Sequence, residues 1–465
     1  MRFILKGIYR NKENIYTYKS ERIIAERNGS IVEVMEKSAT LKTDILGFDK
    51  LYYVFDKDKM IISNRLRDFY DFPIDEYLWP VQCSIGYIPY PFTIFKNVRK
   101  ALPGIEMRFV YKENSGWSCE YGTTELQEFF NLYGHYDVKE FKSDFVTRIG
   151  DIKKTCDRNI IVSFSGGFDS LLLANLFKEH IIGISHYTNE FGEVKKIKAM
   201  LGHLLPNAPW YIFDGKSAID KNGIELYFQS IDEPCFDIAG LAEFLMIKKI
   251  LLSFPKIDPL YILNGQNADG NFANGRKYFK EYLLGILFLN NRLGLNVNKK
   301  ISLNSIRGKV IDYCKSTKTR FDDSYISYYN FNEFYKEGID EVFEIYANSI
   351  NTDRANFSSF LECILIHSNR EYEKFKTIIN NFDIYCLLPF CDLHISKIAF
   401  SIHSKYKVGY KIGKKILRKS FKAIDNAPYF SESFLPIEVW KSMTQSDAFD
   451  NYIKFHADKW LSYRQ

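Results

Sequence analysis

The residues best suited to chemistry stand together in the stretch NIIVSFSGGFDS, at positions 159–170. Serines, glycines and one aspartate are grouped there: Ser163, Ser165, Gly166, Gly167, Asp169 and Ser170. Glycines let a backbone close around a ligand, and the free N–H groups at the start of a helix attract an anion. We therefore expect this stretch to bind a phosphate group.

The flanking residues predict how the stretch is held. Ile160–Phe164 is short, apolar and β-branched, which is typical of a strand buried on both faces of a parallel sheet. The apolar residues from Leu171 to Leu176 then indicate a helix. The alternative interpretation is an ordinary strand-to-helix turn that uses glycine only to change direction.

The hexapeptide SGGFDS, from Ser165 to Ser170, resembles the PP-loop of the N-type ATP pyrophosphatases. This resemblance implies that ATP binds here and is cleaved between its α and β phosphates. The loop is not a Walker A loop, because its glycine spacing differs and no Lys-Ser or Lys-Thr pair follows. Since Asp169 would repel the phosphates unless a divalent cation lay between them, we expect Mg²⁺ at this carboxylate.

A second group of residues resembles asparagine synthetases. DEPCFD precedes an apolar helix expected at Ile238–Phe254, and LYILNGQNADGNF follows at 260–272. In that family a D-x-P-x-x-D stretch and a helix lead to a strand that ends in G-E-G-A/S-D-E-x-F. The resemblance implies that Gly265 lines the nucleotide site and that Asp269 joins Asp169 as a ligand of Mg²⁺. The alternative for Asp269 is a turn residue.

Gln266 departs from the family pattern. Asparagine synthetases carry Glu at this position and β-lactam synthetases carry Tyr. An amide orients a nucleophile by hydrogen bonds but does not accept its proton at neutral pH. Either the amine arrives neutral or another residue is the base. Glu371 and Glu373 are candidates for that base, and the alternative is that both lie on a solvated helix face.

Three later segments resemble the family more loosely: LLPFCD at 387–392, KKILRKSF at 414–421 and LPIEVWK at 435–441. By this resemblance, Lys441 is a catalytic residue that stabilises charge on the adenylate or on the leaving pyrophosphate. The alternative is a surface lysine.

Residues 1–111 contain the short runs LYYVFD, KMIIS and EMRFVYK, which predict a β-rich domain. DILGFDKLYY (44–53) and TIFKNVRKALPG (93–104) resemble parts of the Ntn-type glutaminase half of asparagine synthetases. That half uses an N-terminal cysteine as nucleophile, whereas position 2 here is Arg2 and the first cysteine is Cys83. We expect a truncated glutaminase-like domain that hydrolyses no glutamine.

The polar stretch 112–137 is expected to be a linker, and 138–465 the ATP pyrophosphatase domain. Apolar residues at helical spacing predict a helix from Val138 to Ile152. A strand at Ile181–Tyr187 and a helix at Glu193–Leu205 continue the alternation of strands and helices.

This alternation predicts an α/β fold with a doubly wound parallel sheet and a helical C-terminal part. The ATP site is expected at the carboxyl ends of the strands. Residues 273–350 carry no recognisable motif, and we expect them to shape the acceptor pocket or an interface.

Composition excludes several classes of protein. A chain of 465 residues is long enough for two or three domains. The net charge of +6 includes no long basic run, so no nucleic-acid partner is expected. The 8 cysteines show no zinc-site spacing and are expected to be free thiols. No signal peptide and no membrane-spanning helix are predicted, and a cytoplasmic location is expected.

The resemblance implies an AMP-forming carbon–nitrogen ligase that uses ATP and Mg²⁺ to join a carboxylate to an amine. Lasso-peptide macrolactam cyclases and β-lactam synthetases share this architecture without glutaminase activity. We prefer a cyclase, with a precursor peptide as substrate and a leader protease or leader-binding protein as partner. The alternatives are amidation of a sugar acid or amino acid with free ammonia, and a degenerate synthetase that acts as a scaffold.

Overall fold

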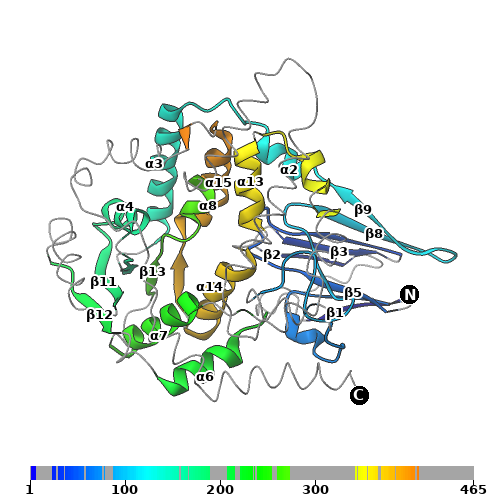
Figure 1. The fold of residues 1–465 in the computed structure, drawn as a ribbon, viewed down its shortest axis with the longest axis horizontal. Helices are drawn as coiled ribbons and strands as arrows, with labels where there is room; N and C mark the ends of the chain where they lie inside the picture. Colours follow the sequence, from blue (N-terminus) through cyan, green and yellow to red (C-terminus); the bar gives the residue numbers. More distant parts are fainter. Residues whose placement is uncertain are drawn as a thin grey trace, which may run out of the picture.

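The architecture was analysed in a computed structural model (Figure 1). The structure describes residues 2–6, 23–27, 30–35, 37–56, 59–75, 78, 87–156, 159–165, 167–188, 207–214, 220–233, 235, 238–253, 259–272, 341–342, 344–352, 354–364, 368–382, 384–403 and 406–407. In Figure 1 a parallel sheet with its helices lies on the left and β-rich layers lie on the right, with α13 (Arg354–Glu362) and α14 (Ser368–Phe382) between them.

The parallel sheet has five strands: β10 (Ile160–Ser163), β11 (Ile181–Thr188), β12 (Trp210–Asp214), β13 (Tyr261–Leu263) and β14 (Tyr385–Leu387). Their spatial order is β12-β11-β10-β13-β14, and every neighbouring pair is parallel. From β10 the chain adds β11 and then β12 on one side. It then crosses back and adds β13 and β14 on the other side of β10. This is the predicted doubly wound sheet.

Helices cover both faces of this sheet. On one face lie α3 (Val138–Lys154), α4 (Phe168–Leu176) and α15 (Leu393–Ser401). On the other face lie α6 (Lys221–Ser230), α7 (Ile238–Ser253) and α14. Alternate residues of β10 point to opposite faces, so Val162 packs in the first core and Ile161 in the second. Burial on both faces explains the continuous apolar run of this strand.

The helix predicted before the phosphate loop is α3, which confirms that prediction. Asp137 accepts hydrogen bonds from the N–H groups of Lys139 and Glu140, and the Glu140 side chain accepts one from the N–H of Asp137. This capping box fixes the start of the helix. Phe141 and Phe145, one turn apart, then fall on its buried face.

The N-terminal part holds two sheets. One has the order β1-β6-β5-β7, built from Arg2–Lys6, Lys59–Ser63, Tyr52–Asp56 and Arg99–Lys100. The other is antiparallel with the order β2-β3-β4-β8-β9, built from Ile23–Arg27, Ser30–Met35, Ser38–Lys42, Glu106–Lys112 and Gly116–Gly122. The three predicted strands in this region are confirmed as β5, β6 and β8.

The segment 112–137 is more ordered than a linker. It contains β9, which pairs with β8, and α2 (Thr124–Phe130), whose Leu126 and Phe129 belong to the N-terminal core. The polar residues of KENSGWSCEYG are compatible with a hairpin here, because the residues of β9 are exposed or half-buried rather than buried.

The N-terminal core is not made by N-terminal residues alone. Phe357, Phe360 and Leu361 of α13 are buried in it, as is Phe400 of α15. Segments from the C-terminal half of the chain therefore complete the core of the β-rich layers.

Two predicted features cannot be compared with the structure: the helix at Glu193–Leu205 lies outside the described residues, as does most of 273–350. Among the residues that the structure describes, no helix has the length and apolar character needed to cross a membrane. The cysteines in this part of the chain are free thiols.

Candidate active site

The switch point of the parallel sheet lies between β10 and β13, where the chain direction across the sheet reverses. Ligands of open α/β sheets bind in the crevice outside the carboxyl ends of such strands. The glycine loop follows β10, and the segment NGQNADG follows β13. Both predicted sequence groups therefore meet at this edge of the sheet.

The loop after β10 is held by its own serines. The Ser165 Oγ accepts a hydrogen bond from the Gly167 N–H at 3.3 Å and lies 3.2 Å from the Ser170 Oγ. The Ser170 hydroxyl donates to the Gly167 carbonyl at 3.1 Å. A Cβ atom at position 167 would lie 3.2 Å from the Ser165 Oγ, so glycine permits this tight turn.

The helix α4 begins directly after the glycine loop. Its cap residue is Gly167, which has no side chain that could hydrogen-bond to the first N–H groups. The first N–H groups of a helix lack partners within the helix, and its dipole favours negative charge there. Asp169 stands in this first turn and is partly buried. The arrangement fits a phosphate group whose charge is shared with a cation at Asp169.

Gly265 brings the two sequence groups into contact. A Cβ atom at position 265 would lie 3.2 Å from the Asp169 Cβ and 3.4 Å from the Ser170 backbone nitrogen. The loop after β13 therefore packs directly on the first turn of α4. Only a residue without a side chain allows this approach at no steric cost.

The backbone around Gln266 is fixed by hydrogen bonds. Its N–H donates to the Asn264 Oδ1 at 2.8 Å, and the Cys391 thiol lies 3.7 Å from its carbonyl oxygen. Asn267 follows with a φ of 70°, a left-handed conformation that asparagine tolerates better than most residues. Its side-chain amide donates to the Phe390 carbonyl at 3.1 Å. These bonds tie the β13 loop to the 3-10 helix η3 (Pro389–Cys391).

The structure describes most of the predicted site residues, but not all of them. Ser163 ends β10, Ser165 and Gly167 stand in the loop, and Asp169 and Ser170 lie in the first turn of α4. Gly265 and Gln266 follow β13. Asp269 belongs to the short helix α8 (Ala268–Phe272), but its side chain lies outside the described residues. Gly166 and Lys441 lie entirely outside the described residues.

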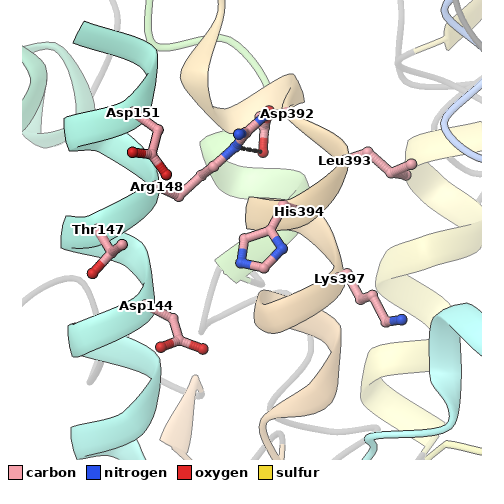
Figure 2. Close-up of a pocket in the computed structure, with 8 residues that line it drawn as sticks. All are labelled: Asp144, Thr147, Arg148, Asp151, Asp392, Leu393, His394 and Lys397. Carbon is pink, nitrogen blue, oxygen red and sulfur yellow. Dashed lines mark hydrogen bonds and ion pairs between the residues drawn. The ribbon is translucent and has the colours of Figure 1, made fainter. Parts of the chain in front are cut away.

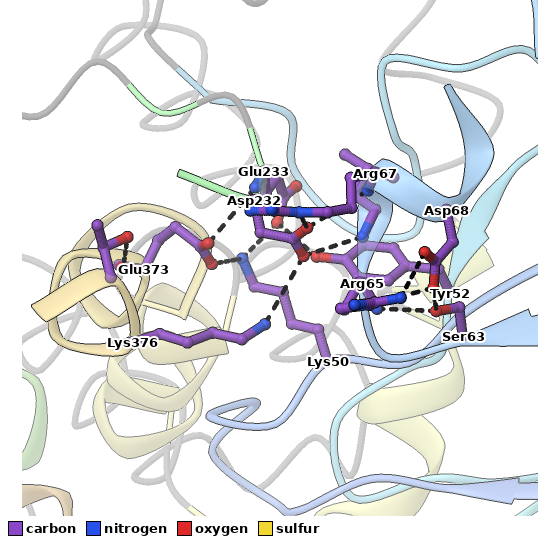
Figure 3. Close-up of polar contacts among 12 residues, drawn as sticks. Lys50, Tyr52, Ser63, Arg65, Arg67, Asp68, Asp232, Glu233, Glu373 and Lys376 are labelled. Atoms are coloured by element: carbon purple, nitrogen blue, oxygen red, sulfur yellow. Dashed lines mark hydrogen bonds and ion pairs between the residues drawn. The ribbon is translucent and has the colours of Figure 1, made fainter. Parts of the chain in front are cut away.

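Of the two proposed bases, Glu373 is buried rather than solvated. It is 2 % exposed, and its Oε2 lies 3.5 Å from the Lys50 Nζ of the N-terminal part. Figure 3 shows Glu373 and Glu233 both pointing at Lys50. The possibility that Glu373 lies on a solvated face is therefore wrong. The side chain of Glu371 lies outside the described residues.

The charged cluster around Glu233 was not predicted from the sequence. The Glu233 carboxylate also binds the buried Lys100 ammonium and accepts a hydrogen bond from the Tyr52 hydroxyl at 3.2 Å. Burial works against the charge of Glu233, yet Lys100 and Lys50 hold its pKa below the ordinary value. No local pattern around Lys50 or Lys100 indicates Glu233, which lies 183 and 133 positions away in the sequence.

A surface pocket of about 630 Å³ lies apart from these residues, between α3 and α15 (Figure 2). Its lining has mixed charge: Asp144, Thr147, Arg148, Asp151, Asp392, Leu393, His394 and Lys397. None of the predicted site residues lines it. The Arg148 guanidinium crosses the gap to Asp392 with contacts of 3.0 and 2.7 Å.

A parallel sheet with a switch point, and a helix that begins there after a glycine loop, are typical of α/β proteins that bind nucleotides. The asparagine synthase family model matches residues 152–428, and the chain belongs to this family. Membership indicates ATP-dependent carbon–nitrogen ligation. No curated protein matches the chain significantly.

Proposed function

We propose that this chain forms an amide bond through an acyl-adenylate. A substrate carboxylate attacks the α-phosphorus of ATP, and pyrophosphate leaves. An amine then attacks the acyl carbon, AMP departs with the electrons of the broken carbon–oxygen bond, and the nitrogen releases a proton to water. The observation that carries the proposal is the contact of Gly265 with the first turn of α4, which puts the β13 loop beside the phosphate loop.

The residues present fit ATP with Mg²⁺. Ser165, Gly167 and Ser170 shape a loop that accepts phosphate, and the terminus of α4 supplies N–H groups. Asp169 would hold the metal, with Asp269 as its proposed second ligand. Mg²⁺ in phosphate sites needs only one or two carboxylates in addition to the phosphates. When bound, the metal neutralises charge on the phosphates.

The preferred acceptor is an amine of the same substrate molecule, as in lasso-peptide macrolactam cyclisation. The proposal assigns no glutamine hydrolysis to this chain. Glutamate release from glutamine by the purified protein would contradict this part of the proposal.

Exchange of labelled pyrophosphate into ATP, measured with a panel of carboxylates and short peptides, tests the activation step. We expect Asp169→Asn to lower the exchange rate by about 100-fold or more, because it removes the charge that balances the phosphates. Asp151→Asn, in α3, is the matched control and should leave exchange unchanged. Absence of both exchange and ATP binding in the unmodified protein would overturn the proposal and favour a scaffold.

A further inference from the structure

The side chain of Asn264 connects a buried carboxylate to the loop after β13, and we call this connection the Asn264 bridge. The Nδ2 donates to the Glu243 Oε1 at 2.7 Å, and the Oδ1 accepts from the Gln266 N–H at 2.8 Å. The backbone N–H of Asn264 donates to the Leu387 carbonyl at 3.0 Å. The backbone and both ends of the side chain are therefore held at the end of β13.

The acceptor at the far end of the bridge is fixed by packing. Glu243 is 8 % exposed, and its helical neighbours Leu241 and Leu245 lie in the apolar core below the sheet. Burial and then the Glu243 charge raise the pKa of the Cys386 thiol in β14, so the carboxylate also lies close to that strand. Because closely packed interiors leave a side chain few positions, α7 presents this carboxylate at a defined place.

The Glu243 carboxylate selects the direction in which the Asn264 amide points. An ionised carboxylate only accepts hydrogen bonds, and a backbone N–H only donates them. A flipped amide would place its oxygen against the carboxylate and its NH₂ group against the Gln266 N–H, so both bonds would be lost. The Oδ1 is therefore kept on the Gln266 N–H.

The bridge spans Gly265, the residue that packs on the first turn of α4. If the peptide between Gly265 and Gln266 rotated, the bond from the Gln266 N–H to the Asn264 Oδ1 would break. The same rotation would alter the approach of Gly265 to Asp169 and Ser170. One hydrogen bond thus restrains both the packing of the loop on α4 and the direction of Gln266.

We propose that Glu243 and Asn264 are positioning residues of the synthetase site. The carboxylate orients the amide, and the amide holds the loop after β13 in the geometry that the reaction needs. This assignment rests on the proposed function, because it gives that loop its part in amide-bond formation. The alternative is that the bridge only satisfies a buried carboxylate, in which case folded variants should keep the reaction rate.

A reversal of the polarity of the bridge tests the assignment. Asn264→Asp sets two carboxylates against each other, so their repulsion should release the loop. In the double variant Asn264→Asp/Glu243→Gln, the new amide donates to the new carboxylate, which still accepts from the Gln266 N–H, and the net charge is unchanged. We expect pyrophosphate exchange at saturating ATP to fall about 10-fold to 100-fold in Asn264→Asp and to return to within about 3-fold in the double variant.

Hydrogen exchange at the Gln266 N–H provides a second readout that needs neither ATP nor turnover. Mass spectrometry of overlapping peptides from the full chain should show less protection of this N–H in Asn264→Asp and restored protection in the double variant. If Asn264→Asp does not fold, Asn264→Ala takes its place, because it removes both side-chain bonds without adding charge. It should lose protection and pyrophosphate exchange in the same way.

The helix α6 offers a matched control pair. The Gln229 Nε2 donates to the Glu225 Oε1 at 3.2 Å on an exposed face. Glu225→Gln/Gln229→Glu reverses this pair in the same manner. It should leave both pyrophosphate exchange and the protection of the Gln266 N–H unchanged.

The assignment is overturned if folded Asn264→Asp or Asn264→Ala keeps the full exchange rate, or if the double variant is no better than Asn264→Asp. The proposed function is judged separately, by pyrophosphate exchange in the unmodified protein. If that exchange is missing while protection responds as expected, the bridge holds the loop and the proposed function fails. Equal pyrophosphate exchange in all variants would keep the proposed function and remove the positioning role.

Discussion

Gly265 is the residue on which the geometry of the proposed nucleotide site depends most. It has no side chain, and the first turn of α4 occupies the space where one would be. The contact explains why a glycine follows β13 at this point, since any Cβ atom would push Asp169 and Ser170 away from the loop.

Gly265→Ala should therefore impair catalysis more than folding. The added Cβ would lie 3.2 Å from the Asp169 Cβ, so one of the two segments must shift by a few tenths of an ångström. We expect the pyrophosphate exchange rate to fall by about 10-fold to 100-fold. Unfolding in urea should show a loss of about 1–3 kcal/mol.

The matched control for this variant is Gly150→Ala in α3. No atom lies within 4 Å of the position its Cβ would take, and the residue is inside a helix. This variant should be more stable by about 0.5–1 kcal/mol and unchanged in exchange. Equal exchange rates for the two variants would contradict the role given to Gly265.

At the scale of elements, Asp392 joins α3 to α15. It caps α15 by accepting a hydrogen bond from the Ile395 N–H at 3.0 Å, and it receives both contacts from Arg148 across the pocket of Figure 2. The side chains of Arg148 and Asp392 are 38 % and 17 % exposed, so solvent screens the pair in part.

A double-mutant cycle on Arg148→Ala and Asp392→Ala should give a coupling free energy of about 1 kcal/mol. Asp392→Ala should cost about 1 kcal/mol more than Arg148→Ala, because it also removes the helix cap. The free energy of unfolding in urea measures both quantities. A coupling near zero, or equal costs for the single variants, would show that the two roles of Asp392 are not both stabilising.

At the scale of the whole molecule, the N-terminal layers and the synthetase domain are joined by buried charge and by a shared apolar core. Glu233 stands after α6 and reaches Lys50 and Lys100 of the N-terminal part. Phe360 of α13 lies in the N-terminal core. Such an interface is too closely packed for the two parts to unfold independently.

Glu233→Gln should lower the stability of the entire chain by about 3–5 kcal/mol, because it leaves two buried lysines without their shared carboxylate. Differential scanning calorimetry should show one transition at a lower Tm. Glu113→Gln is the control, since Glu113 pairs with Lys37 at the exposed end of a hairpin and its loss should leave Tm unchanged. Two separate transitions, or an unchanged Tm for Glu233→Gln, would contradict the joint unfolding.

Much of the local structure could be predicted from the sequence. The strands β5, β6, β8 and β10 and the helices α3 and α7 depend on patterns within a few residues, such as β-branched runs and apolar residues at helical spacing. The stretch 112–137 was harder, because its polar residues suit both a linker and an exposed hairpin.

Some residues of the candidate site could likewise be predicted from the sequence, and others could not. Ser165, Gly167 and Asp169 were predictable because loop, strand and helix follow one another in the chain. Glu233 was not, because its partners Lys50 and Lys100 are 183 and 133 positions away. For Glu373 the alternative of a solvated helix face is wrong, and the sequence could not show this because its partner Lys50 is 323 positions away.

The sequence by itself determined the strand, glycine loop and helix of the proposed phosphate site and the alternation that makes a doubly wound sheet, because neighbouring residues are sufficient to specify them. Only the tertiary structure decided which distant charges meet. It joined Lys50 to Glu233 and packed Gly265 on Asp169. Such contacts depend on the packing of distant segments, which no local pattern encodes.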